Sequence, residues 1–327
     1  MDGKVWATLL TKSQYLPGAL VLDWSLKNVK SKYPLVVMVT PSLPDEAKAI
    51  LRNRKIIIHE VDMLHPENNP NATKLGENFA HFGDTWSKLR VFGLVEYKRI
   101  VLLDSDMIVM RNMDELMTLE LPPDWIAAAH VCACNPLRIS SYPPDWTPEN
   151  CAHSAVVHPT GITNPPVITS TSPRPYTLLN SGTVILTPSE KEMKRIIERL
   201  QTLDPAEFPF PDQDLLAELF KGKWKPLSYV YNALKTLRDI HKPLWRDEEV
   251  RCLHYILDKP WYRSPEQESK WKEVNQWWWD RYQKLEEEMQ RSDPEGWKLV
   301  TSEVLKAQQR EEERERKAKL ATQQKAQ

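Results

Sequence analysis

The sequence lacks the features that define several protein classes. Charged residues interrupt every apolar run well short of membrane-spanning length, and the N-terminus "MDGKVWATLL" has no basic start followed by the apolar core of a secretory signal. The 44 Lys+Arg and 45 Asp+Glu residues nearly cancel, which argues against a broad surface for nucleic acid. Four cysteines in 327 residues are too few for a disulfide scaffold. We therefore expect a globular, cytoplasmic protein with no membrane span and no nucleic-acid partner.

What the chain does contain is an alternation of strand and helix signals over its first half. Apolar runs predict strands at residues 5–10, 34–40 and 55–61, and the stretches between them predict helices at 18–30 and 44–54. This βαβαβ order is typical of an α/β domain with a mostly parallel central sheet. Ligands of such sheets bind beyond the carboxyl ends of the strands.

The rest of the chain is less regular. A helix at 85–98 is predicted to lead into a strand at 99–103, and residues 122–175, rich in Pro, Ser, Thr and Asn, are predicted to be a long irregular loop. Further predicted elements are a strand at 177–187, helices at 189–203 and 212–222, and a late strand at 250–256. We assign residues 1–265 to a single domain with an irregular insertion at 130–175, 266–300 to a Trp-rich helical extension, and 301–327 to a charged tail, helical or disordered.

Residues 100–109, "IVLLDSDMIV", place two aspartates in an apolar strand-like run. Because strand side chains alternate, Asp104 and Asp106 are predicted to point the same way. Two carboxylates at a strand end suit a hard divalent ion such as Mg²⁺ or Mn²⁺. By itself the pair is also compatible with turn or capping aspartates, and a haloacid-dehalogenase-type phosphatase is an alternative of lower weight.

The wider context favours one interpretation. The ordered segments "VWATLLTKSQYLPGALVLDWSL", "SKYPLVVMVTP", "SKLRVFGLVEYKRIVLLDSDMIVMRNMDEL", "LLNSGTVILTPS", "FPDQDLLAELF", "VYN" and "LHYILDKPW" together resemble glycosyltransferase family 8. Within that family the chain looks closest to the galactinol synthases and more distantly similar to the glycogenins. The resemblance implies a nucleotide-sugar-binding, Rossmann-like fold of GT-A type and a Mn²⁺-dependent transferase that retains anomeric configuration.

The resemblance also implies roles for individual residues. Asp104 and Asp106 match the family's metal-binding Asp-x-Asp, and His254 matches the histidine that completes the metal site. Lys259 matches a lysine that faces the diphosphate, whereas Leu257 stands where a glycine is usual. Mn²⁺ is the expected ion, with Mg²⁺ as the alternative, since an imidazole ligand shifts preference towards Mn²⁺.

Further positions match the donor-binding part of the family pattern. Tyr15 matches the tyrosine that stacks on uracil, and Leu9 and Leu10 match backbone contacts near the nucleotide. Three side chains near the donor phosphates and sugar are implied as well: Lys88, Asn180 and Gln213. Asp212 is the carboxylate to test as a nucleophile, and a covalent intermediate and same-face attack by the acceptor both stay open.

These assignments predict transfer of a hexosyl group from UDP-galactose or UDP-glucose to a polyol, sugar or protein hydroxyl, with myo-inositol as the first candidate acceptor. Glycogenin-like self-glucosylation is less favoured because "ALKTLRDIHKPLW" contains no tyrosine. A non-catalytic binding protein on the same fold is a second class of alternative. A homodimer is left open.

Three cysteines and three histidines gather in the predicted insertion: Cys132, Cys134, Cys151, His130, His153 and His158. Such groups at short spacing can bind zinc. The spacing C-x-C…C-x-H is not a standard zinc pattern, however, so ordinary buried or loop thiols are the favoured interpretation.

Overall fold

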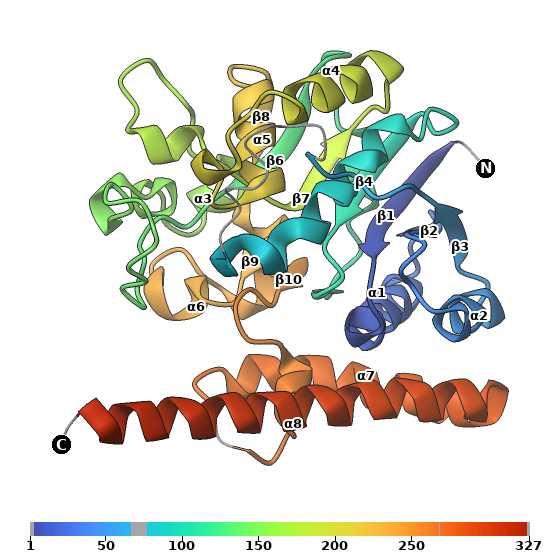
Figure 1. The fold of residues 1–327 in the computed structure, drawn as a ribbon. Coiled ribbons are helices and arrows are strands. Elements are labelled where there is room, and N and C mark those ends of the chain that lie inside the picture. The colour runs from blue at the N-terminus through green and yellow to red at the C-terminus, as the bar shows by residue number, and fades with distance from the viewer. Residues whose placement is uncertain (1–2, 67–76, 268, 326–327) are drawn as a thin grey trace.

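A seven-stranded sheet forms the centre of the computed structural model, which describes residues 3–66, 77–267 and 269–325 (Figure 1). The strand order is β3-β2-β1-β4-β7-β6-β8. The strands are β1 (Lys4–Leu10), β2 (Leu35–Val39), β3 (Ile57–Glu60), β4 (Arg99–Leu103), β6 (Ile126–His130), β7 (Leu179–Leu186) and β8 (Trp224–Leu227). Only the pairings of β7 with β4 and with β6 are antiparallel. The predicted mostly parallel α/β sheet is confirmed.

Helices cover both faces of this sheet. On one face, α1 (Leu16–Asn28) and α2 (Asp45–Asn53) share a hydrophobic core with β1 and β2. On the other face, η3 (Glu77–Gly93), α4 (Glu190–Leu200) and α5 (Pro211–Leu219) enclose a second core. Strand β2 is buried at every residue, as expected for a parallel strand with both faces covered.

Two predicted elements differ from the structure. The helix predicted at 85–98 belongs to η3, a 3₁₀ helix that ends at Gly93. The stretch predicted to be irregular from residue 122 contains β6, a strand inside the main sheet. Its sequence, "IAAAH", is nearly devoid of β-branched and aromatic residues, so propensity gave no strand signal.

A small second sheet stands beside the carboxyl end of β4. It consists of β5 (Met107–Val109), β10 (Cys252–His254) and β9 (Ala233–Leu234) in the order β5-β10-β9. His254 pairs with Met107 in the antiparallel β5–β10 ladder, and the Tyr255 amide donates to the Asp106 carbonyl (3.0 Å). This pairing fixes a histidine from late in the chain beside the aspartates of residues 104–106.

Short helical segments make most of the remaining connections. They are η1 (Ser13–Tyr15), η4 (Asp114–Thr118), η5 (Pro148–Asn150), η6 (Ala152–Ala155), α3 (Thr160–Thr163), η7 (Arg174–Thr177), η8 (Pro205–Glu207), η9 (Tyr229–Tyr231), α6 (Leu237–Ile240), η10 (Asp247–Glu249) and η11 (Pro260–Tyr262). Within the described ranges, no helix has the length and apolar character needed to cross a membrane.

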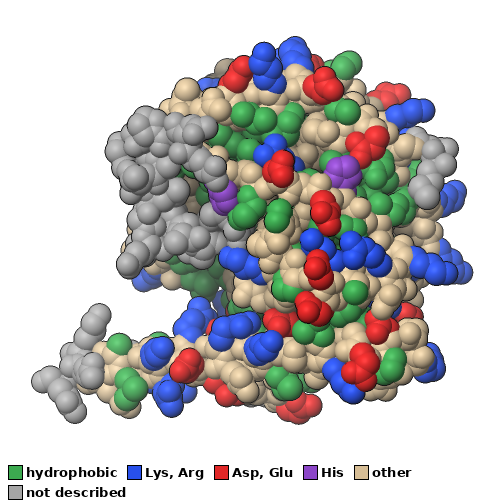
Figure 2. All heavy atoms as spheres, turned by 45° about the vertical axis from the view of Figure 1, so that its right-hand side comes forward, with side chains coloured by type: hydrophobic (Ala, Val, Ile, Leu, Met, Phe, Trp, Pro, Cys, Tyr) green, Lys and Arg blue, Asp and Glu red, His purple; other side chains and the backbone are tan. Residues whose placement is uncertain are grey.

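The chain ends in a hairpin of two long helices, α7 (Lys272–Ser292) and α8 (Pro294–Lys325). Both pack against α1 and η11. A column of rings joins the hairpin to η11, with centroid separations of 5.2 Å from Trp261 to Trp278, 5.0 Å from Trp278 to Tyr282 and 4.8 Å from Tyr282 to Trp297. Figure 2 shows acidic and basic side chains interspersed along the projecting part of the hairpin, the pattern of a solvated helical face.

Gly18 is the point at which α1 touches the turn that carries the two aspartates. A Cβ at this position would overlap the Ser105 carbonyl oxygen and lie 2.8 Å from the Trp261 ring. Backbone and a fully buried tryptophan cannot move aside easily, so the close approach requires glycine.

We therefore expect Gly18→Ala to destabilise the protein by about 1–3 kcal/mol, the usual cost of overpacking. Chemical denaturation of the full chain would measure this loss. Gly93→Ala is the matched control, because its Cβ would meet only the Met193 side chain, at 3.4 Å. Equal stabilities of the two variants would contradict the assignment.

Candidate active site

A cavity of about 1200 Å³ opens at the carboxyl ends of β1 and β4. Asp104, Asp106, Lys88 and His254 line its floor, and residues from the 131–146 part of the insertion form one wall. Its position is where an α/β sheet is expected to bind its ligand. The sequence placed the insertion near the active site, and the lining of this cavity includes it.

The two aspartates lie in the turn between β4 and β5, just beyond the end of the strand. His254 Nε2 is 3.3 Å from Asp106 Oδ1 and 3.7 Å from Asp104 Oδ2. One ligand atom from each of the three residues lies within 4.8 Å of the others. Two carboxylates and an imidazole at these separations can bind one divalent cation.

Two asparagines orient the histidine for this task. The Asn232 side-chain amide donates to Asn180 Oδ1 (2.7 Å), so Asn232 Oδ1 faces His254 Nδ1 at 2.9 Å as an acceptor. His254 therefore carries its proton on Nδ1, which leaves the Nε2 lone pair free for a metal ion. The ring packs so closely on Gly182 that a Cβ there would overlap it.

Lys88 joins Asp104 to Asp212 within the cavity. Its Nζ lies 2.6 Å from Asp104 Oδ1 and 2.9 Å from Asp212 Oδ2, and donates to Ser181 Oγ at 3.2 Å. Burial alone would lower the pKa of Lys88, but Asp104 and Asp212 raise it above its ordinary value, so the ammonium stays charged. Burial also raises the pKa of Asp104, even though Lys88 opposes the shift.

Lys259 is the cation that pairs with Asp106, the second aspartate of the turn. Its ammonium donates to Asp106 Oδ2 and to the Tyr255 carbonyl oxygen (3.0 Å). Burial would raise the pKa of Asp106, but the Lys259 ammonium holds it well below its usual range. Burial and Asp106 likewise act in opposite directions on Lys259, and the carboxylate prevails and raises the lysine pKa.

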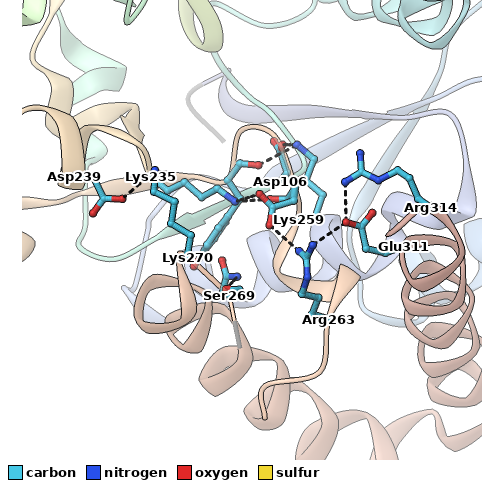
Figure 3. Close-up of polar contacts among 12 residues, drawn as sticks. Asp106, Lys235, Asp239, Lys259, Arg263, Ser269, Lys270, Glu311 and Arg314 are labelled. Carbon is cyan, nitrogen blue, oxygen red and sulfur yellow. Dashed lines mark hydrogen bonds and ion pairs between the residues drawn. The ribbon is translucent and has the colours of Figure 1, made fainter. Parts of the chain in front are cut away.

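A chain of charged groups connects this centre to α8 (Figure 3). Lys235 Nζ lies 3.0 Å from Asp258 Oδ1, and Arg263 donates to Asp258 Oδ2 at 3.0 Å. The other end of the Arg263 guanidinium reaches Glu311 (2.9 Å) and Glu315 (2.6 Å) on α8. Burial lowers the pKa of Lys235 to about 8, against the opposing effect of Asp258. The loop that carries Lys259 is thus held from both sides.

Leu257 adopts the left-handed backbone conformation, with φ of 66°. Glycine is the residue that adopts this conformation without strain. The glycine usual at this position in the family pattern therefore matches the backbone of this loop, although this chain carries leucine there. The loop keeps the conformation at a cost of roughly 1 kcal/mol or more.

Of the residues that the family resemblance implied would contact the donor, one does not line the cavity. Leu9, Tyr15, Asn180, Asp212 and Gln213 line it. Tyr15 meets the Trp261 ring edge-on with centroids 6.0 Å apart, and Asn180 donates to Gln213 Oε1 at 3.2 Å. The Leu10 side chain is buried in the hydrophobic core instead, which leaves only its backbone for a contact with a nucleotide.

Several residues of the site did not follow from sequence reasoning. The structure adds Asn232 behind His254, and Lys235, Asp258 and Arg263 behind Lys259. The "VYN" segment contributed to the family resemblance but gave Asn232 no role. Arg263 follows directly after the "KPWY" segment, but its partners on α8 are about 50 residues away in the sequence.

The fold is that of a GT-A glycosyltransferase. Among solved structures, the galactosyltransferase LgtC in complex with donor and acceptor sugar analogues superposes with a TM-score of 0.56 at 16% identity, covering 88% of this chain and 99% of that one. The glycosyltransferase GlyE of Streptococcus pneumoniae gives a TM-score of 0.52 at 17% identity, with 91% of this chain and 63% of that one covered.

The sequence comparisons identify the family. The family model described as "Glycosyl transferase family 8" matches residues 7–264, and the chain belongs to this family. It is 30% identical to galactinol synthase 7 of Arabidopsis thaliana over 292 residues, covering 85% of this chain and 81% of the relative. Galactinol synthase 1 of Ajuga reptans is 28% identical with the same coverage. The predicted family is confirmed, and the chain is a glycosyltransferase. This result replaces the phosphatase and the non-catalytic binding protein that the sequence alone left as alternatives.

Removal of the Asn232 side chain, whose oxygen accepts a hydrogen bond from His254 Nδ1, should weaken metal binding. In Asn232→Ala the Nδ1 proton loses its partner, so the ring is free to turn and to change tautomer. We expect Mn²⁺ affinity to fall about 10- to 100-fold, the usual effect of losing such a contact. Titration of the protein with Mn²⁺, followed by electron paramagnetic resonance of the free ion, measures it.

Asn164→Ala is the control, since Asn164 is an exposed asparagine of the insertion. Wild-type affinity in the Asn232 variant, with its fold intact by circular dichroism, would show that the asparagine does not orient the ligand.

Proposed function

We propose that this chain transfers a hexosyl group from UDP-galactose or UDP-glucose to an acceptor hydroxyl with retention of anomeric configuration, and that Asp104, Asp106 and His254 bind the required Mn²⁺. The observation that carries the proposal is the convergence of these three ligands on the cavity floor between Lys88 and Lys259. The similarity to galactinol synthases makes myo-inositol the first acceptor to test.

The charge of the site supports binding of a diphosphate only together with a divalent ion. Asp104, Asp106 and Asp212, when ionised, outnumber the ammonium groups of Lys88 and Lys259 by one. A divalent cation reverses this balance and gives the cavity floor a net positive charge. Mn²⁺ suits two carboxylates and an imidazole better than Mg²⁺, which prefers oxygen ligands alone.

The reaction breaks the bond between the anomeric carbon and the diphosphate oxygen, and UDP leaves with the bonding electrons. The acceptor oxygen forms the new bond to the anomeric carbon and loses its proton. Bound Mn²⁺ supplies Lewis acidity towards the diphosphate. Lys259 and Lys88, both held charged by their carboxylates, stabilise the negative charge that develops on UDP.

Asp212 and Gln213 supply the groups on the sugar side. Both line the cavity at the start of α5, and Gln213 accepts from Asn180. The Asp212 carboxylate pairs with Lys88, and its place in the cavity makes it available either as a nucleophile or as a stabilising charge beside the anomeric carbon. Both routes to retention, through a covalent intermediate or by same-face attack, stay compatible with this placement.

The nucleotide end of the donor is assigned to the mouth of the cavity near β1. Tyr15, held against Trp261, offers a ring face for uracil. Leu9 lines the same cavity, and the backbone of Leu9 and Leu10 is the proposed further contact with the nucleotide.

We expect the reaction to occur in the cytoplasm. The four cysteines support this, since none is in a disulfide, as is usual for a reducing compartment.

The first test is UDP release from UDP-galactose and from UDP-glucose, with and without Mn²⁺ and myo-inositol. We expect release that needs Mn²⁺, rises with myo-inositol and is faster with one donor. Asp106→Asn should lower it by at least about 10²-fold, because the variant loses a ligand charge of the ion that stabilises the leaving group. The anomeric configuration of the product, read by nuclear magnetic resonance, tests retention.

Asp124→Asn is the matched control, since Asp124 is half-exposed and pairs with Lys223 outside the cavity. Mn²⁺-dependent release that ignores myo-inositol would keep the transferase and reject this acceptor. Full activity of Asp106→Asn would reject the metal site itself.

The ion pairs between Arg263 and α8 should affect binding of the UDP-sugar donor more than the rate at which the bound donor reacts. Arg263→Ala breaks the contacts that hold Asp258 and the Lys259 loop against α8. We expect KM for the UDP-sugar to rise several-fold, with a smaller change in kcat, because the loop is then less well ordered before the donor binds. Steady-state kinetics measure both constants.

Arg316→Ala serves as the control on the same helix, where its only described ion pair is a 3.9 Å contact with Glu313. A KM for Arg263→Ala equal to that of Arg316→Ala would show that α8 does not support the donor site.

A further inference from the structure

A second cluster of metal-ligating side chains lies at the wall of the cavity, apart from the aspartates. The Sγ atoms of Cys132, Cys134 and Cys151 and the Nε2 atom of His241 all lie within 4.8 Å of one another. His241 Nε2 is 3.6 Å from Cys132, 3.2 Å from Cys134 and 3.7 Å from Cys151. Three of the four residues are buried, and Cys132 is partly exposed and lines the cavity.

Hydrogen bonding does not explain this arrangement. A single imidazole nitrogen has either one N–H or one lone pair, so it can form one good hydrogen bond and not three. A disulfide would join two of the sulfurs and leave the third beside the imidazole, and all four cysteines of the chain are free thiols. A shared cation at the centre accounts for all three contacts at once.

The separations match one geometry in particular. In tetrahedral zinc sites Zn–S is about 2.3 Å and Zn–N about 2.0 Å, so neighbouring sulfur and nitrogen ligands stand roughly 3.5 Å apart. The three S···N distances of 3.2, 3.6 and 3.7 Å lie on both sides of that value. Thiolates are soft ligands that favour Zn²⁺ over Mn²⁺ or Mg²⁺, which distinguishes this cluster from the aspartate site.

The histidine in the cluster differs from those expected from sequence proximity. His130 Nε2 lies 2.9 Å from the Pro166 carbonyl oxygen, and His153 Nε2 lies 3.1 Å from the His130 carbonyl oxygen. These contacts involve the Nε2 atom of each ring, and none of His130, His153 and His158 is among the grouped residues. His241 directly follows α6 and is 90 residues from Cys151 in the sequence.

We propose that Cys132, Cys134, Cys151 and His241 bind one Zn²⁺ ion as a structural site that fixes the insertion to the segment after α6. Four protein ligands fill a tetrahedral ion and leave no open position for substrate, which makes the site structural and not catalytic. The green insertion and α6 lie together at one side of the molecule in Figure 1.

The ion would shape the wall of the cavity that the insertion forms. Cys134 and Cys151 form a small core with Trp146, and Asn135, Leu137 and Tyr142 from the same stretch line the cavity. Most of this stretch has no strand or long helix to hold it, so a metal ion that joins residues 132, 134, 151 and 241 replaces the missing secondary structure. Loss of the ion is therefore expected to disturb this wall of the cavity.

The test is the zinc content of the purified full-length chain, measured by inductively coupled plasma mass spectrometry after dialysis against a weak chelator. We expect about one zinc per chain, the stoichiometry of a four-ligand site. Cys151→Ser and His241→Ala should lose most of it. Cys252→Ser, a buried thiol outside the cluster, and Asp106→Asn should both keep it.

A second measurement does not depend on how the variants fold. Replacement of zinc by Co²⁺ in the wild-type protein should give intense ligand-field bands and thiolate-to-metal charge transfer, as tetrahedral thiolate sites do. A folded wild-type chain without zinc, or a disulfide among Cys132, Cys134 and Cys151 by mass spectrometry, would overturn the proposal. So would bound metal whose cobalt spectrum lacks thiolate bands.

Discussion

Compensation of one buried and one partly buried carboxylate is the constraint on which the rest of the site depends. Asp106 is buried and Asp104 partly exposed, and both follow directly on a strand that is itself largely buried. Each has its own ammonium group, Lys88 for Asp104 and Lys259 for Asp106, and both face the same imidazole. Without these cations the carboxylates would be protonated or the turn would not form. The elements that carry the two lysines and the histidine must therefore meet at this turn.

That requirement explains much of the architecture. Lys88 comes from η3 on one face of the sheet, whereas His254 and Lys259 come from the small second sheet and the loop after it. The β5–β10 ladder sets the register of His254 against residue 107. Close packing against Gly18 and Gly182 then leaves the turn and the imidazole no room to shift. The site is preorganised by packing as much as by charge.

The C-terminal hairpin acts on the same turn from outside the sheet. The rings from Trp261 to Trp297 form a continuous column that anchors η11. The ion pairs from Lys235 through Asp258 and Arg263 to Glu311 hold the adjoining loop (Figure 3). Packing and charge are thus both used to position Lys259, whose loop includes a leucine in the left-handed conformation. The extension therefore supports the part of the cavity that Lys259 and Arg263 line.

The sequence by itself determined the family and the first part of the sheet. Strong apolar runs predicted β1 to β4 with helices α1 and α2, and the ordered motifs predicted Asp104, Asp106, Lys88, His254 and Lys259 as residues of one site. Local pattern failed at β6, whose alanines carry no strand propensity, and at η3, where the helical type depends on packing.

Only the tertiary structure decided which distant residues meet. Asn232 behind His254, Glu311 beside Arg263, and His241 among the cysteines each lie tens of residues from their partners, and no spacing rule relates them. Such contacts arise when separate elements pack on one sheet edge. Periodicity and propensity describe neighbours within an element, whereas the packing of buried charges and thiols selects partners across the whole chain.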